Sequence, residues 1–549
     1  MLDFSTDREQ TITPAKAWLL ALLCAVWIGT GLVGHDPWKP DEASSFGLVY
    51  HILHSGDWLV PAIAGEPYMD KPPLFYWTAA ASAKLFSPAL ALHDGARLAS
   101  GLYTLLTLLF TGLAARELFG KGQGWSTAVI LIGCLGMLVR AHQMITDLAL
   151  LAGCALMLYG YALAVRFQRH AGLLLGSGLG IGFLSKGFIA PMLFLLIGTG
   201  LLAFRYWRTR YFLATLALAL LCALPWLAIW PWLLYQRSPQ LFMEWAWHDN
   251  IGHWLNYAQH YFGRDAWYYL NALPWLAWPA WPLALWAAWR ARGKLRYDAE
   301  YQLLLIVFGA MLIALSFVPN IKEVYALPML LPLALLATAA LPSLRRGAAN
   351  ALDWFGIMTF ALLGILLWWG WAGLLLDNHA KITLWLKDYQ PGFEPVFRAT
   401  PFWIAVVFSV LWITLVWRVG RSIRRSVINW AAGTTLIWIL AMTLWLPWLD
   451  NGKSYRGMVM QLKAALPAHY NCIGRISLGD SQRAMLDYFG GITTRHDAHH
   501  TCDLALVQGT RYIRPLEASP AWKKIWEGGR PGDKGERYRL YRRQPTNKS

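Results

Sequence analysis

TDLALLAGCALMLYGYALAV, residues 146–165, is a run of twenty residues with a single charged side chain, Asp147. A helix of that length is about 30 Å long, which matches the hydrocarbon core of a bilayer. The basic segment 166–169 follows directly, and the next apolar stretch, 171–204, again ends at arginines, in 205–210. This alternation of apolar stretches and basic segments predicts a membrane protein with several spanning helices.

The composition of the whole chain points the same way. Hydrophobic residues make up 57% of the 549 residues, charged residues make up 14%, and the mean hydropathy is +0.37. Ordinary soluble domains have about 25% charged residues, so this chain is too apolar for a soluble multidomain enzyme, a disordered protein, a collagen or a disulfide scaffold. The net charge of +17 does not indicate nucleic-acid binding, because basic residues collect in the cytoplasmic loops of membrane proteins.

Five basic clusters define the expected topology. The apolar stretch between successive clusters fits two spans of about 20 residues each, for example 211–234 with 268–289, although 171–204 is short for two. Ahead of the first cluster, single spans are expected near 17–34, 96–115, 125–141 and 146–165. All five clusters then lie on one side of the membrane, which the positive-inside rule assigns to the cytoplasm. The total is about 13 spans, and this odd number places the N-terminus inside and the C-terminus outside. The clusters are 166–169, 205–210, 290–296, 345–346 and 418–425.

Three longer segments are expected outside the cytoplasm. The first, 35–94, holds seven acidic and three basic residues, and amphipathic pieces at 44–55 and 73–85 are typical of helices at a membrane interface. The second is 235–267. The third begins at residue 450, after the last span, where the composition becomes polar.

The expected domain organisation is therefore an all-α transmembrane domain over 1–449 and a small α/β domain over 450–549. Two of the six cysteines, Cys472 and Cys502, fall in the second domain and form a candidate disulfide in an oxidising compartment, with two free thiols as the alternative. The pattern in this domain predicts helices at 455–466 and 481–489 and strands at 472–478 and 504–508.

Trp38-Lys39-Pro40-Asp41-Glu42 places two adjacent carboxylates just outside the first span. A carboxylate beside an apolar wall suits general-base catalysis, because burial raises its pKa toward neutrality. The alternative is structural, since two acids in the first turn of a helix interact favourably with its dipole. Asp41 and Glu42 are the first two catalytic candidates, and the pattern leaves both interpretations open.

Tyr68-Met69-Asp70-Lys71-Pro72-Pro73 contains a lysine that is unexpected in an acidic outer loop. The two prolines hold the segment in an extended turn. Lys71 is a candidate ligand for an anion, with Asp70 in a supporting role. The alternative is an ordinary surface ion pair between the two side chains.

Three ionisable residues, Arg97, Asp147 and Lys186, lie at or near the outer ends of apolar stretches. Charges at this depth are costly and mark functional sites. We expect Asp147 in the catalytic group, Lys186 in phosphate binding and Arg97 as a supporting residue. The alternatives are snorkelling for the two bases and a structural salt bridge of Asp147 with Arg140 or Arg97.

Residues 319–328, with the sequence PNIKEVYALP, form a predicted tight outer turn between two spans. This turn contributes Lys322 and Tyr325. Alone, its Lys-Glu pair would be a solvated turn. With Lys71, Lys186 and Arg264 it would form a cationic cluster on the outer face, for which a phosphate at the bilayer surface is the expected ligand.

His248, His253 and Glu66 are weak candidates for a divalent metal site. Their spacing matches no standard zinc pattern, and interfacial histidines without a metal are the alternative.

Several short motifs follow one another in a fixed order along residues 17–340. They are Pro40-Asp41-Glu42, Gly56-Asp57-Trp58, Asp70-Lys71-Pro72-Pro73, Tyr76-Trp77, Gly95-Ala96-Arg97-Leu98, Thr146-Asp147, Leu184-Ser185-Lys186-Gly187, Phe262-Gly263-Arg264, Trp267-Tyr268-Tyr269 and Tyr325-Ala326-Leu327-Pro328. Each motif alone is weak, but the ordered set is specific. It resembles the GT-C superfamily of integral-membrane glycosyltransferases, in particular the lipid A aminoarabinose transferases of the ArnT type and the protein O-mannosyltransferases.

The resemblance implies a multi-pass protein of the bacterial inner membrane whose active site and C-terminal domain are periplasmic. It implies transfer of a sugar, 4-amino-4-deoxy-L-arabinose in the ArnT type, from an undecaprenyl-phosphate donor to a lipid A phosphate, with Asp41 essential. Protein Ser/Thr is the acceptor in the mannosyltransferase alternative. The chain departs from the ArnT pattern at Ser44 and Gly47, where Arg and Glu are usual, and at His253, where Arg is common.

The mechanism that fits these residues is a single displacement with inversion at the anomeric carbon. Asp41 orients or deprotonates the acceptor, while Lys71, Arg264 and Lys322 bind the donor phosphate, and no cofactor or metal is required. A polyprenyl-lipid flippase or transporter is the alternative of another class. Transporters, however, tend to place ionisable residues in mid-span, whereas here they collect at the outer surface. A non-catalytic scaffold is the third class.

Overall fold

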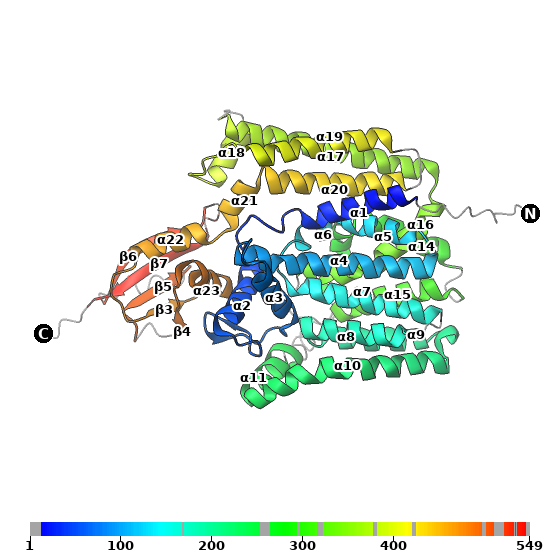
Figure 1. Cartoon of the computed structure of the whole chain (residues 1–549), viewed down its shortest axis with the longest axis horizontal. Coiled ribbons are helices and arrows are strands. Elements are labelled where there is room, and N and C mark those ends of the chain that lie inside the picture. Colours follow the sequence, from blue (N-terminus) through cyan, green and yellow to red (C-terminus); the bar gives the residue numbers. More distant parts are fainter. Residues whose placement is uncertain are drawn as a thin grey trace, which may run out of the picture.

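The structure is a computed structural model and shows a bundle of long helices with a small sheet at one end (Figure 1). The side chains of 264–266 lie outside the described part. The described residues are 13–166, 169–252, 264–293, 297–315, 322–376, 381–419, 424–496, 501–509, 521–531, 533 and 535–544.

Most helices of the bundle run roughly parallel to one axis of the molecule (Figure 1). Its first half contains α1 (Pro14–Gly29), α4 (Leu92–Phe119), α5 (Gln123–Gly133), α6 (Leu135–Arg140), α7 (Thr146–Val165), α8 (Ala171–Lys186), α9 (Ile189–Leu202) and α10 (Arg210–Arg237). Its second half contains α13 (Arg264–Leu276), α14 (Ala280–Ala291), α15 (Ala299–Leu315), α16 (Leu330–Ala340), α17 (Arg346–Leu375), α19 (Ala399–Arg418) and α20 (Arg425–Thr443).

Within the described residues, seven helices are long and apolar enough to cross a membrane, and four apolar helices are shorter. The protein is thus a multi-pass helical membrane protein, as predicted. The stretch 171–204 does form two short helices, α8 and α9. Two expected single spans are interrupted instead. The helix expected at 125–141 breaks at Cys134, and the one expected at 268–289 breaks before Pro279, where a proline ring cannot continue the preceding helix.

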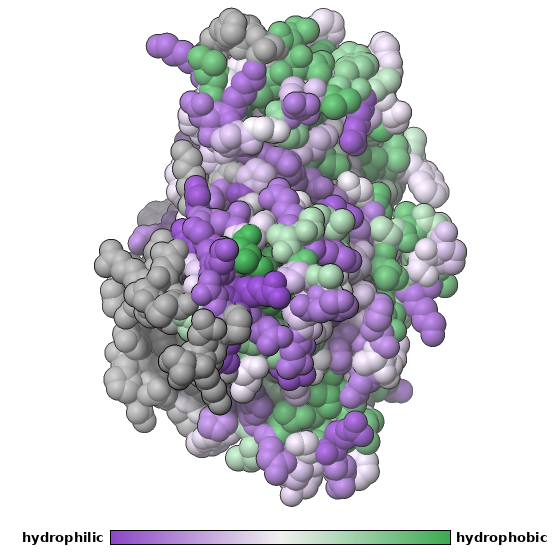
Figure 2. All heavy atoms as spheres, turned by 90° about the vertical axis from the view of Figure 1, so that its left-hand side faces the viewer, coloured by the Kyte–Doolittle hydropathy of each residue, from purple (hydrophilic) through white to green (hydrophobic). Residues whose placement is uncertain are grey.

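The two ends of the bundle differ in character. The connections after α7, α9, α14, α16 and α19, which carry the arginine clusters, lie at the right-hand end in Figure 1, opposite to the sheet. The other end carries α2 (Asp41–Ser55), α3 (Leu74–Phe86), α11 (Pro239–Met243), α18 (Lys381–Tyr389) and α21 (Leu446–Lys453). Seen from that end, the centre is hydrophilic and hydrophobic side chains gather toward the flanks (Figure 2).

Glycines allow α7 and α8 to pack with their backbones in close contact. A Cβ atom on Gly153 would lie 2.8 Å from the backbone nitrogen of Gly182, and one on Gly178 would lie 2.6 Å from that of Met157. Small residues at such contacts are the usual way in which membrane helices approach each other. The close packing brings the start of α7 beside the end of α8, and both contribute to the candidate site.

The C-terminal domain has a mixed five-stranded sheet in the order β4-β3-β5-β7-β6. The strands β3 (Ile473–Ile476) and β5 (Leu504–Gln508) lie where strands were predicted, as do the helices α22 (Arg456–Ala465) and α23 (Asp480–Met485). The strands β4 (Arg495–His496), β6 (Trp522–Gly529) and β7 (Arg537–Arg543) were not predicted. Cys472 and Cys502 form a disulfide with a Cα–Cα distance of 4.9 Å.

Candidate active site

A polar cavity lies where α2, the turn before α3, the start of α7, the end of α8 and the segment 322–325 meet. Of the predicted site residues, the cavity brings together Asp41, Asp70, Lys71, Asp147, Lys186, Lys322 and Tyr325, from parts of the chain that are far apart in sequence. The other residues that line it are Ser44, Ser45, Leu48, Tyr68, Tyr76, Ile145, Thr146 and Val324.

Asp41 is the carboxylate that α2 presents to this cavity. It is the first residue of the helix, and its side chain is 35% exposed. Its Oδ1 lies 3.7 Å from Nζ of Lys322, whose side chain is 49% exposed. The pair is therefore open to a ligand on the outer side, and a substrate with either charge can engage one of its members.

Glu42, the second predicted catalytic carboxylate, lies on the other side of α2 and is fully buried. Its Oε1 accepts a hydrogen bond from Nε of Arg97 at 2.6 Å, and its Oε2 accepts one from the backbone N–H of Trp38 at 3.0 Å. Burial raises the pKa of Glu42, but Arg97 and the hydrogen bonds outweigh this effect and hold the pKa below its ordinary value. Glu42 is thus an anchor for the start of α2, and its side chain does not line the cavity.

Arg97 is a buried residue that contacts the start of α2 through Glu42. Its side chain is fully buried, and it pairs with Glu42 and, at 2.7 Å, with Asp94. It also donates to the backbone carbonyls of Leu32 at 3.1 Å and His35 at 3.0 Å. Since all of its partners belong to the protein, the buried guanidinium stabilises the segment between α1 and α2.

Lys71 and Asp70 form the polar floor contributed by the turn before α3. Their Nζ and Oδ2 atoms are 3.4 Å apart, and Tyr68 donates a hydrogen bond to Asp70 at 3.2 Å. Burial alone lowers the pKa of a lysine, but Asp70 and the hydroxyls of Tyr76 and Tyr68 outweigh it, so the pKa of Lys71 lies well above its ordinary value. Lys71 therefore keeps its positive charge at neutral pH.

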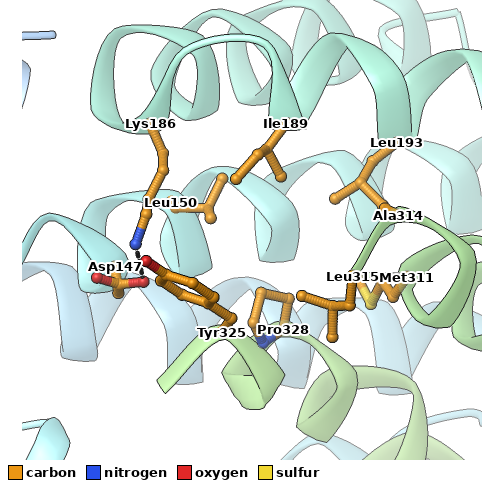
Figure 3. A pocket seen from close by; sticks show the side chains of 10 residues that line it. All are labelled: Asp147, Leu150, Lys186, Ile189, Leu193, Met311, Ala314, Leu315, Tyr325 and Pro328. Carbon is orange, nitrogen blue, oxygen red and sulfur yellow. Dashed lines mark hydrogen bonds and ion pairs between the residues drawn. The ribbon is translucent and has the colours of Figure 1, made fainter. Parts of the chain in front are cut away.

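Asp147 pairs with Lys186, which corrects the expected alternative of a salt bridge to Arg140 or Arg97. The two side chains point toward each other from α7 and α8, and Nζ of Lys186 also lies 4.3 Å from the ring centroid of Tyr325 (Figure 3). Both charged side chains are less than a tenth exposed. The sequence singled out both residues but did not predict that they pair, because the close packing of α7 on α8 sets the pairing.

A second, apolar cavity begins at the same three residues. Asp147, Lys186 and Tyr325 form its polar end, and Figure 3 shows the apolar side chains continuing away from them. They are Leu150, Ile189, Leu193, Met311, Ala314, Leu315 and Pro328. The two cavities thus meet at a junction formed by the Lys186–Asp147 ion pair and Tyr325, and the lysine of this pair suits a ligand with an anionic head and an apolar tail.

Thr146 is a further polar residue that lines the cavity, at the start of α7. It is the first residue of α7, it is 1% exposed, and it lines the polar cavity. Its buried Oγ1 has no hydrogen-bond partner among the described residues. The N-terminus of a helix attracts anions because its first backbone N–H groups lack partners in the helix. A phosphate bound here would find a hydroxyl donor as well as Lys186.

Besides Glu42 and Arg97, two further predicted residues lie away from the cavity, and two others lie outside the described part of the chain. Glu66 instead forms ion pairs with Arg475 and Arg483 of the C-terminal domain, at 2.6 and 2.8 Å. His248 is exposed in the helical turn 244–251. His253 and the side chain of Arg264 lie outside the described residues. In the part of the chain that the structure describes, no group of three or more metal-ligating side chains occurs.

The buried pair between α7 and α8 allows a test of the geometry by stability alone. Asp147→Asn or Lys186→Met should each destabilise the fold by about 3–5 kcal/mol, because each leaves one buried charge without its partner. The double variant should recover most of that loss. Thermal unfolding of the purified proteins in one detergent measures this, and a double variant no more stable than the weaker single variant would contradict the pairing.

The chain is similar to several known proteins. Residues 70–230 match the family model described as dolichyl-phosphate-mannose-protein mannosyltransferase. The chain is 29% identical over 459 residues to an undecaprenyl phosphate-alpha-4-amino-4-deoxy-L-arabinose arabinosyl transferase of Pseudomonas aeruginosa (strain LESB58), covering 80% of this chain and 76% of that protein. A relative of the same name from Edwardsiella ictaluri is 29% identical over 382 residues, covering 64% of this chain and 66% of that protein.

Solved structures show the same fold. ArnT from Cupriavidus metallidurans in the apo state has a TM-score of 0.69 at 18% identity, with 96% of this chain and 98% of that chain covered. The structure of the same protein bound to undecaprenyl phosphate has a TM-score of 0.68 with the same coverage. The family match and the relatives agree, and we conclude that the chain is a membrane glycosyltransferase that resembles the ArnT type of the GT-C superfamily.

Proposed function

We propose that the chain transfers 4-amino-4-deoxy-L-arabinose from an undecaprenyl-phosphate donor to a phosphate group of lipid A, at the periplasmic face of the bacterial inner membrane. The observation that carries this proposal is the meeting of a polar and an apolar cavity at Asp147, Lys186 and Tyr325. A polyprenyl-phosphate sugar has the same three parts in the same order, namely an apolar chain, an anionic phosphate and a polar sugar. The sugar and the donor lipid are those in the names of the relatives.

The donor would bind with its chain in the apolar cavity and its phosphate at the junction of the two cavities. Lys186, Lys71 and the Thr146 hydroxyl would hold the phosphate, and the sugar would then lie in the polar cavity. Both lysines line that cavity, and charge-assisted hydrogen bonds to phosphate are among the strongest in proteins. For Lys186 to serve in this way, the phosphate must share it with Asp147.

In the transfer itself, an oxygen of the acceptor phosphate attacks the anomeric carbon of the sugar. The bond between that carbon and the donor phosphate oxygen breaks, and undecaprenyl phosphate leaves with the electron pair. Lys71 and Lys186 stabilise the charge that develops on the leaving group, which is electrostatic catalysis by donors already in place. Attack from the opposite face inverts the anomeric configuration.

Asp41 and Lys322 would receive the acceptor on the outer side of the cavity. A phosphate acceptor is already ionised and needs little proton abstraction, so Asp41 chiefly orients it through a shared proton or through Lys322. Oδ1 of Asp41 and Nζ of Lys322 are 3.7 Å apart, so the two side chains would separate to receive the acceptor between them. Lys322 offsets the repulsion between the Asp41 carboxylate and an anionic acceptor.

The distribution of charge supports the proposed orientation in the membrane. The connections that carry the arginine clusters lie at the end of the bundle opposite to the sheet. The positive-inside rule assigns that end to the cytoplasm. The polar cavity and the C-terminal domain would then face the periplasm, where lipid A is accessible and a disulfide can form.

Transfer of a mannose to protein Ser/Thr is the second candidate, because the family model that matches residues 70–230 describes protein mannosyltransferases. In that reaction Asp41 would have to act as a general base toward a hydroxyl.

Mass spectrometry of lipid A and of periplasmic proteins from cells with and without the chain separates the two candidates. We expect loss of an aminoarabinose from lipid A when the chain is absent. Unchanged lipid A together with loss of hexoses from proteins would overturn the proposal in favour of the second candidate.

A further inference from the structure

The segment between α1 and α2 leads directly to Asp41 and contains no helix or strand. Residues 30–40 form turns and bends, and α2 begins at Asp41. Such segments move more than the elements that they connect. A catalytic side chain must be held to within about 0.5 Å of its working position, so the contacts that fix this segment also fix Asp41.

One side of the segment is held by the membrane domain. Arg97 donates to three of its carbonyls, and Asp94 accepts a hydrogen bond from the backbone N–H of Gly34 at 3.1 Å. These contacts come from α4 and are buried in the core of the protein. They fix the beginning of the segment but not its last residues, 39 and 40.

The other side of the segment is held by the C-terminal domain. Asp36 accepts hydrogen bonds from Ser454 at 2.7 Å and from Nε of Arg456 at 2.9 Å. The carbonyl of Pro40, directly before Asp41, accepts one from the hydroxyl of Ser481 at 2.8 Å. These contacts join residues more than 400 positions apart in sequence, and they reach the residue next to Asp41.

Lys39 adds an ion pair to these connections. Its Nζ forms an ion pair with Asp533 and lies 3.3 Å from Oε2 of Glu536. Glu536 is 7% exposed, and its own position is fixed by a complete set of donors. They are Tyr455 at 3.2 Å, Gln482 at 2.9 Å, Tyr538, and Nε of Arg530 at 2.8 Å.

The electrostatics of Glu536 make it a permanent anion. Burial raises its pKa, but the hydrogen bonds from Tyr538 and Arg530 outweigh this effect and lower the pKa to about 2. The side chain of Arg530 is fully buried, and it also donates to the carbonyl of Gly452 at 2.6 Å. Lys39 thus contacts a negative charge that four side chains of the domain hold in place.

Close packing of α23 on α2 supplies a second, independent contact. A Cβ atom on Gly47 would lie 2.3 Å from Cβ of Ala484, so the domain approaches α2 as closely as two backbones allow. Glu66, on the hairpin β1 (Ala62–Ile63) to β2 (Glu66–Pro67), adds its ion pairs with Arg475 and Arg483. The domain therefore contacts the membrane domain at three separate places, namely the segment 30–40, the helix α2 and the hairpin β1–β2.

We infer that the C-terminal domain positions the Asp41 carboxylate for sugar transfer, with Lys39 and Glu536 as positioning residues that act through the backbone of residues 39 and 40. The inference rests on the proposed function for the statement that Asp41 takes part in sugar transfer. The contacts between the domain and residues 36–40 are observed independently of that function. Neither residue lines the polar cavity, so the donor site should be unaffected when their ion pair is removed.

Lys39→Met in the purified full-length protein should lower kcat about tenfold or more, because a misplacement of about 1 Å can cost a hundredfold in rate. The KM for the donor should stay within about twofold of the parent value. Lys39→Arg should restore most of kcat, since a guanidinium can still reach the two carboxylates. Glu536→Gln, which removes the charge from the domain side, should resemble Lys39→Met.

The matched control is Lys524→Met, which removes an exposed lysine on β6 that pairs with Glu527. It should behave like the parent. A kcat of Lys39→Met within twofold of the parent, or an equal loss in Lys39→Arg, would overturn the inference.

Amide hydrogen exchange supplies a readout that does not depend on the proposed reaction. Exchange in a peptide covering residues 34–44 should accelerate about tenfold in Lys39→Met and in Glu536→Gln, but not in Lys524→Met. Unchanged exchange in both variants would overturn the inference even if the parent uses another sugar. A parent that transfers no aminoarabinose but shows the expected exchange would overturn only the proposed function.

Discussion

Asp41→Asn should lower kcat for sugar transfer by about 10²–10⁴-fold, the range observed when a general base or an orienting carboxylate is removed. The replacement keeps the size of the side chain and leaves Glu42 and Arg97 in place to hold the start of α2. It removes the charge that faces Lys322 across 3.7 Å and that would orient the acceptor. Single-turnover transfer to lipid A, measured with saturating donor, gives this value directly.

Donor binding should survive the same change, because Asp41 lies on the outer side of the cavity, whereas the junction of the two cavities is less exposed. Asp388→Asn, an exposed carboxylate on α18 at the same end of the protein, is the matched control and should leave both quantities unchanged. An Asp41→Asn protein with more than half of the parent kcat would remove Asp41 from the catalytic group.

Lys71→Ala should lower kcat/KM by about tenfold to a hundredfold. A hydrogen bond to a charged group contributes roughly 1.5–3 kcal/mol, and each 1.4 kcal/mol is a factor of about ten. The pKa of Lys71 lies well above its ordinary value because of Asp70 and two tyrosines, so the lysine is cationic throughout the physiological pH range. The loss should therefore not depend on pH between about 6 and 8.

Lys71→Arg should restore only part of the activity, because a planar guanidinium cannot replace a compact ammonium group between Asp70 and the phosphate. Lys84→Ala, which removes an exposed lysine from the last turn of α3, is the control and should behave like the parent. If Lys71→Ala bound donor and turned over like Lys84→Ala, Lys71 would be only the ion-pair partner of Asp70.

The membrane domain could be predicted from the sequence because its signals are local. An apolar run of about 20 residues followed by arginines identifies a span without knowledge of its neighbours, and α7 lies where that signal placed it. The helix break at Cys134 was missed, since Cys134 is apolar and resembles its surroundings. In the structure, its backbone N–H bonds the carbonyl of Leu131, and the helix restarts at Leu135.

The strands β6 and β7 could not be predicted because their signal is not local. β7 reads RYRLYRR, which resembles a charged loop. Its Tyr538 and Leu540 are buried only because the strand pairs with β5, about thirty residues earlier, and with β6. The strands β3 and β5, by contrast, are short apolar runs that are recognisable on their own.

The candidate site could be predicted by residue type but not by pairing. Asp147 and Lys186 stood out as charges in apolar stretches, while their contact depends on glycines that bring α7 and α8 together. Asp41 and Glu42 could not be separated, because adjacent residues of a helix point about 100° apart and the sequence does not say which direction faces the cavity. Lys39 and Glu536 had no signal at all, since they are 497 positions apart.

The central claim, that a polyprenyl-phosphate sugar reacts at the junction of the two cavities, is tested most directly by reconstituting the reaction. Purified protein is supplied with undecaprenyl-phosphate aminoarabinose, lipid A and a Ser/Thr-containing peptide, and the masses of all products are measured together with released undecaprenyl phosphate. The account predicts that lipid A gains one sugar for each undecaprenyl phosphate released, and that Asp41→Asn yields neither. Lipid A of unchanged mass after complete incubation with a folded, donor-binding protein would contradict it.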